Sequence, residues 1–290
     1  MFKGSIVAIV TPFKNGKVDE KALGELIEWH IAEGTDAIVP CGTTGESATL
    51  EYDEHYRVIE YTVQVVNGRI PVIAGTGANS TDETIKMTAK AKKLGADGAL
   101  LVCPYYNKPT QEGIFQHYEK VAKTVDIPII LYNVPGRTAV NIMPETVARL
   151  SAIENVVAIK EATGNMAQAS DVIRLCGDNI TVLSGDDFTT FTLLALGGKG
   201  VISVVANIAP KDVSDMIKAW NNGKLEESRN IHFRLEPLNK AMFIETNPIP
   251  VKTALSMMGR IQEEFRLPLC SMSSANKEKL KEALKSYGLI

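Results

Sequence analysis

The residue with the greatest capacity for chemistry is a lysine inside an apolar segment. Lys160 lies in segment 156–161, where most neighbours are β-branched or small, so a strand buried on both faces is predicted. A buried ammonium pays a large desolvation penalty, which it relieves by pairing with an acid or by losing its proton. In the first case Lys160 pairs with a buried carboxylate, such as that of Glu161, and only holds the fold. In the second case the neutral amine is a nucleophile that can form a Schiff base with a carbonyl substrate.

Strand-like and helix-like segments alternate along the whole chain. The expected strands are 5–10, 37–41, 71–74, 98–103, 127–132, 156–161, 180–184 and 200–205. A helix-period segment is expected after each strand, for example 19–33, 53–66, 81–94, 112–125 and 144–151. This alternation without a linker predicts a closed (β/α)8 TIM barrel over residues 1–223. Residues 224–290 are predicted to be a C-terminal helical extension packed on the barrel, with helices at 225–243, 251–258 and 276–286.

Polar side chains gather at the predicted strand ends. In such barrels the chemistry takes place at the C-terminal ends of the strands. Hydroxyls, phenols, one arginine and one lysine would therefore face a common mouth, which suits a small, oxygen-rich carbonyl acid. The strand-end residues concerned are Thr43, Thr44, Tyr105, Tyr106, Tyr132, Arg137, Lys160, Gly185 and Ile202.

Composition argues against several other classes of protein. Of the 290 residues, 45% are hydrophobic and 22% charged, as in ordinary globular proteins. A net charge of -3 gives no general attraction to nucleic acid or to anionic membranes. No apolar run reaches the length of a membrane span. We therefore expect neither nucleic acid nor membrane as a partner.

Histidines and cysteines predict no metal site. The four histidines fall in predicted helices without an H-E-x-x-H pattern, and His30, His55 and His117 are expected on helix surfaces. The four cysteines stand far apart without a C-x-x-C pair, so we expect them to be reduced and the protein to be cytoplasmic.

Loop composition predicts neither a nucleotide cofactor nor a phosphorylated substrate. Segment 75–80 begins like a dinucleotide-binding loop but lacks the third glycine. Segments 185–187 and 206–208, after the seventh and eighth strands, are acidic or apolar where phosphate-binding barrels are cationic and rich in glycine. No cofactor is expected.

Several motifs, in order along the chain, resemble those of the dihydrodipicolinate synthases, within the wider family of pyruvate-dependent class I aldolases and N-acetylneuraminate lyases. The motifs are G-T-T-G-E at 42–46, A-G-T-G-A-N at 74–79, P-Y-Y-N at 104–107, Y-N-V-P-G-R-T at 132–138, I-K-E-A-T-G at 159–164, S-G-D-D at 184–187 and N-P-I-P-V-K at 247–252. The resemblance implies a lyase that condenses pyruvate with L-aspartate 4-semialdehyde, a step towards diaminopimelate and lysine.

The resemblance also implies catalytic roles. Lys160 would form the Schiff base with pyruvate, and Tyr132 would donate and accept the protons. Thr43 and Tyr106 would be relay partners of Tyr132, with Tyr106 reaching in from a neighbouring subunit of a homotetramer built from two dimers. The structural alternatives are a barrel-filling Tyr132, a turn-capping Thr43 and an interface aromatic at Tyr106.

Substrate-binding residues follow from the same resemblance. Thr44 and the backbone of Ile202 would hold the pyruvate carboxylate, and Gly185 is a further candidate at this site. Arg137 would bind the carboxylate of the semialdehyde through its planar fork of donors.

An allosteric site for L-lysine is implied as well. Its candidate residues are Ser47, Ala48, His55, Asn79, Glu83 and Tyr105. The sequence departs from the pattern of lysine-sensitive relatives at one position, because Tyr52 stands where they often carry a histidine.

Two other functions remain open at this point. One is a different pyruvate lyase, such as an N-acetylneuraminate or 2-keto-3-deoxy-sugar-acid aldolase, against which Thr43 and Arg137 argue. The other is a non-catalytic barrel that binds a small metabolite for regulation, against which the presence of both Lys160 and Tyr132 argues.

Overall fold

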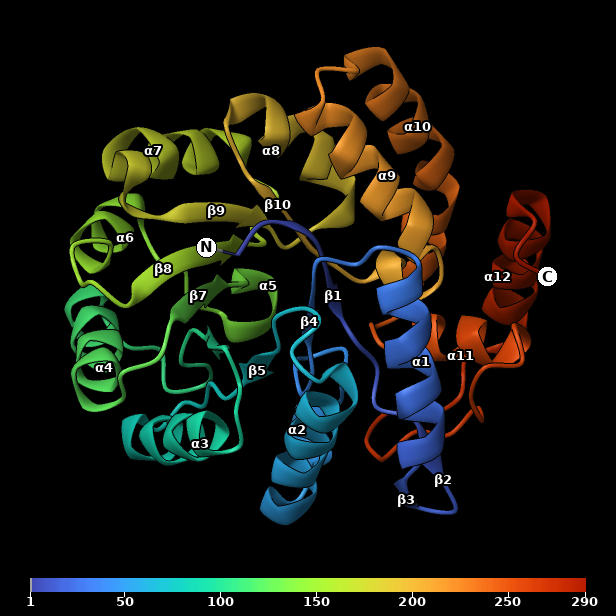
Figure 1. The fold of residues 1–290 in the computed structure, drawn as a ribbon, viewed down its shortest axis with the longest axis horizontal. Helices are drawn as coiled ribbons and strands as arrows, with labels where there is room; N and C mark the ends of the chain where they lie inside the picture. The colour runs from blue at the N-terminus through green and yellow to red at the C-terminus, as the bar shows by residue number, and fades with distance from the viewer. Residues whose placement is uncertain (1) are drawn as a thin grey trace.

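The computed structural model describes residues 2–290 and shows a closed barrel of parallel strands (Figure 1). Its strands are β1 (Gly4–Ala8), β4 (Ala37–Val39), β5 (Ile73–Gly75), β6 (Gly98–Val102), β7 (Ile129–Asn133), β8 (Val156–Glu161), β9 (Thr181–Ser184) and β10 (Gly200–Ser203). Their hydrogen-bonded order is β4-β1-β10-β9-β8-β7-β6-β5, and a parallel bridge from Ile38 to Val72 joins β4 to β5. The predicted (β/α)8 barrel is confirmed.

The helices between the strands form a ring around them in Figure 1. They are α1 (Glu20–Ala32), α2 (Tyr52–Val66), α3 (Thr81–Lys93), α4 (Gln111–Thr124), α6 (Pro144–Leu150), α7 (Met166–Cys176), α8 (Thr190–Leu196) and α9 (Pro210–Asn221). Each places its apolar face against the outward-facing strand residues, as βαβ crossovers require. No predicted strand or helix differs from the observed one by more than two residues at either end.

Alternation along each strand separates two apolar layers. The barrel interior is filled by side chains that include Ile6, Val39, Ile130, Ala158 and Ile202, all buried. Because successive strand residues point to opposite faces, Lys160 shares the inward face of β8 with Ala158. The strand period therefore aims the lysine into the barrel.

The C-terminal residues continue the same core. Three helices follow: α10 (Leu225–Met242), α11 (Ile249–Met257) and α12 (Ser274–Tyr287). Helix α10 packs along α9, and α12 packs on α10 and α11 at the right of Figure 1. Leu238, Val251 and Leu280 belong to one apolar cluster with Val7 of β1 and Ile208. These helices are therefore packed on the barrel, as predicted for this part of the chain.

Two small elements were not predicted. A two-stranded hairpin joins β2 (Phe13–Lys14) to β3 (Lys17–Val18), and a short helix α5 (Pro135–Thr138) follows β7. The hairpin turn is Asn15-Gly16, and both residues have positive φ, 55° and 78°. An Asn-Gly pair is a strong signal for a two-residue hairpin, so the sequence did contain the information.

The prediction for three histidines was wrong. His30, His55 and His117 are buried rather than spread over helix surfaces, because each finds a polar partner inside. His30 Nδ1 lies 3.2 Å from Thr35 Oγ1, His55 Nε2 2.8 Å from the Gly75 carbonyl oxygen, and His117 Nδ1 2.9 Å from Thr81 Oγ1. Burial lowers the pKa of His30 to about 3 and that of His117 to about 4.

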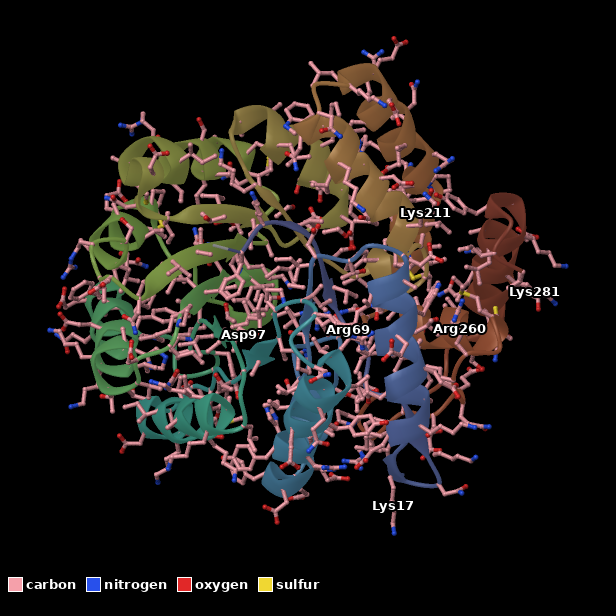
Figure 2. The ribbon with its side chains drawn as sticks, viewed as in Figure 1. Lys17, Arg69, Asp97, Lys211, Arg260 and Lys281 are labelled. Atoms are coloured by element: carbon pink, nitrogen blue, oxygen red, sulfur yellow. The ribbon has the colours of Figure 1, made fainter. Side chains whose placement is uncertain are left out.

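Charged side chains lie mainly on the outside of the ring. Figure 2 shows Lys17 on the hairpin, Lys211 on α9 and Lys281 on α12 extending from the body of the protein. Across residues 2–290, none of the helices has the length and hydropathy needed to span a membrane.

The burial of His117 predicts how stability depends on pH. Its folded pKa of about 4 lies below the ~6.5 of an unfolded imidazole, so the unfolded state binds more protons between these values. The free energy of unfolding should therefore fall as the pH drops below about 6.5, with His117 contributing about 1.4 kcal/mol per pH unit. His117→Gln should remove this contribution in urea unfolding at pH 7, 6 and 5.

His232→Gln is the matched control. His232 is only partly buried on α10, and Glu236 opposes the lowering of its pKa, so its effect on the slope should be smaller. Equal pH slopes for the parent protein and His117→Gln would contradict the prediction.

Candidate active site

A cavity of about 520 Å³ opens at the C-terminal ends of β4 to β7. Its wall includes Thr43 after β4, Gly77 after β5, Val102 at the end of β6 and Tyr132 on β7. Asn247, from the segment between α10 and α11, closes another side. The cavity thus lies at the end of the barrel where the sequence places the chemistry.

Lys160 and Tyr132 are partners across neighbouring strands. Parallel pairing of β7 with β8 sets Tyr132 opposite Lys160. Lys160 Nζ lies 4.3 Å from the centre of the Tyr132 ring, and the two residues are 5% and 6% exposed. Lys160 is not itself part of the cavity wall, but Tyr132, the ring beside its amine, is.

The ion-pair alternative for Lys160 does not occur. None of the ion pairs among residues 2–290 includes it. Glu161, one residue further along β8, accepts hydrogen bonds from Asn133 Nδ2 at 3.2 Å and from the Thr163 N–H at 2.8 Å. Because strand side chains alternate, Glu161 faces away from the barrel interior. Lys160 is therefore a buried amine without a carboxylate partner.

Gly185, predicted to bind substrate, lies against the stem of Lys160. A Cβ on this glycine would come within 2.6 Å of Ala162 Cβ, 2.9 Å of Lys160 Cγ and 3.0 Å of Lys160 Cε. Any larger residue would push the lysine aside. The glycine after β9 thus provides the space in which the Lys160 side chain is extended.

The two threonines of the G-T-T-G-E turn differ in their surroundings. Thr43 lines the cavity, whereas Thr44 is 2% exposed. The Thr44 hydroxyl accepts a hydrogen bond of 3.0 Å from Asn247 Nδ2. Thr43 and Tyr132 therefore both line the cavity, whereas the Thr44 side chain is fixed by its hydrogen bond to Asn247 of the C-terminal region.

Arg137 lies on α5 at the edge of the same cavity. It is exposed, and its Nη2 donates a hydrogen bond of 3.1 Å to the carbonyl oxygen of Asn247. That bond uses one donor of the guanidinium and leaves the others available for an anion.

Ile202 lies on β10, and its side chain is wholly buried in the barrel. The backbone just after it is held by Asp187, which accepts hydrogen bonds from the N–H groups of Val204 and Val205 at 2.9 and 3.1 Å. Burial raises the pKa of Asp187, and a hydrogen bond from the Ser203 hydroxyl opposes this shift.

Tyr106 is not brought together with Thr43 and Tyr132 within the chain. It is 90% exposed and is not part of the cavity wall. Its φ of 71° is in the left-handed region, which is uncommon for an aromatic residue. The neighbouring Tyr105 is 40% exposed and does line the cavity.

Most of the candidate allosteric residues line the same cavity. Ser47, Ala48, His55, Glu83 and Tyr105 all line it. Asn79 does not, but its Nδ2 donates a hydrogen bond of 3.2 Å to the Tyr105 carbonyl oxygen. Tyr52 also lines the cavity, and its hydroxyl donates to Glu83 Oε1 at 2.8 Å. That bond to an anionic acceptor raises the pKa of Tyr52.

Sequence reasoning missed the contribution of N-P-I-P-V-K to the site. Asn247 is 5% exposed and contacts both Thr44 and Arg137, while its Oδ1 is buried without a partner. Lys252 pairs with Glu46 of the G-T-T-G-E turn. Both motifs are visible in the sequence, but nothing local joins residues that are 203 and 206 positions apart. Residues 2–290 contain no group of three or more side chains arranged to hold a metal ion.

A buried lysine amine without a carboxylate partner, next to a tyrosine at the C-terminal strand ends of a barrel, is suited to the Schiff-base chemistry of class I lyases and aldolases. Within this class, the family model described as "Dihydrodipicolinate synthetase family" matches residues 1–287. The chain belongs to that family and is a lyase of the class I aldolase type.

The similarity to known proteins extends over the full length of the chain. The 4-hydroxy-tetrahydrodipicolinate synthase of Thermodesulfovibrio yellowstonii is 71% identical over 290 residues, covering 100% of both chains. A crystal structure of dihydrodipicolinate synthase from Aquifex aeolicus has a TM-score of 0.98 at 55% identity, with 99% of each chain covered. The enzyme from Acinetobacter baumannii, complexed with pyruvate, has a TM-score of 0.98 at 50% identity, with 100% of each chain covered.

One further structure has a relevant ligand. The enzyme from Cyanidioschyzon merolae, with lysine bound, has a TM-score of 0.97 at 42% identity and covers 100% of this chain and 99% of its own.

Proposed function

We propose that this chain condenses pyruvate with L-aspartate 4-semialdehyde through a Schiff base on Lys160. This is the reaction of a 4-hydroxy-tetrahydrodipicolinate synthase in diaminopimelate and lysine biosynthesis, the activity named for its full-length relatives. The observation that carries the proposed mechanism is the buried Lys160 amine, without a carboxylate partner, 4.3 Å from the centre of the Tyr132 ring.

The first step joins the enzyme to pyruvate. The neutral amine of Lys160 attacks the C2 carbonyl carbon, the carbonyl oxygen takes a proton, and the resulting hydroxyl leaves as water when the imine forms. Tyr132 gives and takes these protons, which requires its phenol to exchange protons with a relay. Thr43 lines the same cavity and supplies the first hydroxyl of that relay. The Thr44 hydroxyl and the backbone at Ile202 hold the pyruvate carboxylate.

The second step makes the carbon–carbon bond. Loss of a proton from pyruvate C3 converts the imine to an enamine, whose C3 attacks the aldehyde carbon of the semialdehyde. The amino group of the semialdehyde then replaces Lys160 on the imine carbon, which closes the ring and frees the enzyme. Arg137, exposed at the cavity edge, binds the semialdehyde carboxylate through its remaining donors.

The two steps can be tested separately. Pyruvate with borohydride should label the chain covalently at Lys160, because reduction traps the imine. Lys160→Arg should abolish both the label and turnover, since a guanidinium stays protonated. Arg137→Ala should still be labelled, but kcat/KM for the semialdehyde should fall about 30- to 1,000-fold, the range expected for a lost charge-assisted contact. Peptide mapping and steady-state assays measure the two effects.

Lys199→Arg is the matched control, because this exposed lysine lies just before β10, at the opposite end of the barrel. It should leave both label and turnover unchanged. A label on another residue would overturn the mechanism, and equal loss of trapping and turnover in Arg137→Ala would overturn the role of Arg137.

For the assembly, we propose a homotetramer made of two tight dimers, in which Tyr106 completes the relay of the neighbouring subunit. Support comes from the 90% exposure of Tyr106 next to Tyr105 at the cavity rim, where bulky phenols would otherwise be left in water. A second face offers another apolar contact, since Phe191 packs on Trp220 and His232, and His232 on the 62% exposed Phe233.

Mixing two defective variants tests whether Tyr106 acts across subunits. Tyr106→Phe and Lys160→Arg should each have low activity alone. After unfolding and refolding together, half of the dimers are mixed, and one of their two sites has both residues intact. About a quarter of the activity of the parent protein should return, because a two-fold interface exchanges the residue between partners. Activity equal to the average of the two variants, or a fully active monomer in sedimentation, would contradict the shared site.

Feedback by L-lysine is a second proposal for the same cavity. The Glu83 carboxylate can accept a hydrogen bond from the ammonium group of L-lysine. Asn79 and Tyr105 can donate hydrogen bonds to the α-carboxylate of the same ligand. The lysine-bound relative supports this reading. The Tyr52 hydroxyl already occupies Glu83 Oε1, so the ligand must compete with it.

Tyr52→Phe should therefore tighten the binding of L-lysine. Freeing the Glu83 carboxylate from this competing hydrogen bond should lower the Kd for L-lysine by up to roughly tenfold. Calorimetry and inhibition assays measure the change. Tyr61→Phe, whose hydroxyl lies between α1 and α2 against Gly24, should have no effect. Absence of binding to either protein at millimolar L-lysine would show that the pocket does not serve regulation.

We also propose that the enzyme works in the cytoplasm. All four of its cysteines are free thiols, and Cys41, Cys103 and Cys176 are buried, as is usual for proteins of a reducing compartment.

A further inference from the structure

The most deeply buried charges of the described residues are those of Glu46 and Lys252. Both side chains are 0% exposed, and Lys252 Nζ donates to Glu46 Oε1 across 206 residues of sequence. The other carboxylate oxygen accepts the Arg266 N–H at 3.2 Å. The ammonium also lies 4.2 Å from the centre of the Phe13 ring. Every charged atom of the pair is thus held by the protein rather than by water.

Such a pair is a costly way to stabilise a fold. Burial lowers the pKa of Lys252, and the attraction of Glu46 opposes this shift. The desolvation of two charges offsets most of their mutual attraction, so apolar residues of the same size would stabilise the core as well or better. In several proteins, buried polar or ionic groups instead specify a unique register between the segments that carry them.

The segment that carries Glu46 is the turn with the two site threonines. Glu46 has a left-handed φ of 53°, and its N–H donates to the Thr43 carbonyl oxygen at 3.1 Å. Inside the turn, the Gly45 carbonyl oxygen accepts the Thr11 hydroxyl at 2.7 Å. A displacement of Glu46 would therefore move Thr43 and Thr44 with it.

The segment that carries Lys252 is already part of the cavity wall. Asn247, five residues earlier, donates to the Thr44 hydroxyl and accepts from Arg137. Lys252 lies on α11, and its N–H donates to the Pro248 carbonyl oxygen at 3.0 Å. The ion pair thus fixes the turn after β4 and the start of α11 relative to each other.

We propose that Glu46 and Lys252 are positioning residues of the reaction, which set the Thr43 and Thr44 hydroxyls at the distances that the relay and the pyruvate carboxylate require. This inference rests on the proposed function of those threonines. It makes the segment before and within α11 a functional part of the active site, although both side chains of the pair are wholly buried.

The test is to remove both charges at once and keep the shape. The double variant Glu46→Gln with Lys252→Met leaves no unpaired charge and keeps an oxygen for the Arg266 N–H, so it should fold, with a lower melting temperature because the buried amide N–H groups lack an acceptor. We expect KM for pyruvate to rise about tenfold or more and kcat to fall about tenfold or more, since a misplacement of about 1 Å can cost about a hundredfold in rate. Borohydride trapping at saturating pyruvate should still label Lys160.

Amide hydrogen exchange supplies a readout that does not depend on the reaction. Exchange at residues 42–46 should become faster in the double variant, while exchange in β8 stays unchanged. If the parent protein is not labelled by pyruvate, the proposed function fails, and the exchange data still decide whether the pair positions the turn. Unchanged kinetics, or unchanged exchange at 42–46, would overturn the inference.

Two further variants complete the design. Glu263→Gln with Lys277→Met removes another ion pair of the C-terminal region, one that does not contact the turn, and should leave KM and kcat unchanged. Lys252→Arg keeps the charge but alters its reach and geometry, so it tests position in a folded protein even if the double variant does not fold. It should raise KM for pyruvate, and a value equal to that of the parent protein would overturn the inference.

Discussion

The pairing of β7 with β8 is the constraint on which the site depends. It places Tyr132 opposite Lys160, and closure of the barrel removes both side chains from water. An amine in this position has no carboxylate to stabilise its charge, and its nearest described partner is an aromatic ring whose centre lies 4.3 Å away. The same closure that buries the barrel interior therefore leaves the Lys160 amine beside Tyr132 without a carboxylate partner among the described residues.

A polar layer behind these strands keeps the pair in register. One residue beyond the reactive pair, Asn133 lies opposite Glu161, and its Nδ2 donates to that carboxylate and, at 2.8 Å, to Asn141 Oδ1. Because strand side chains alternate, this network stabilises the outer face without placing a carboxylate beside Lys160. The motifs Y-N and K-E thus each combine one residue of the proposed reaction with one whose hydrogen bonds hold the strands together.

The C-terminal region contacts the candidate active site as well as covering the barrel. Asn247 contacts Thr44 and Arg137, and Lys252 neutralises Glu46. Catalytic groups gain their rate advantage from being held in place before the substrate arrives, which needs support from outside their own loops. In this protein that support comes from the residues before and within α11, which reach the turn after β4.

Local pattern was enough to predict most of the architecture. Two-residue alternation, helical periodicity and strand-end motifs predicted the barrel, its C-terminal helices and the presence of Lys160 and Tyr132 at one mouth, because these depend on neighbours a few positions away. Burial of His30, His55 and His117, the bridging role of Asn247, and the Glu46–Lys252 pair depended on the tertiary structure. Each of these is decided by a partner on another element or past the end of the same helix, and in the ion pair the partners are 206 residues apart. A residue's own periodicity tells which way it points, but only the folded chain determines which polar group it meets there.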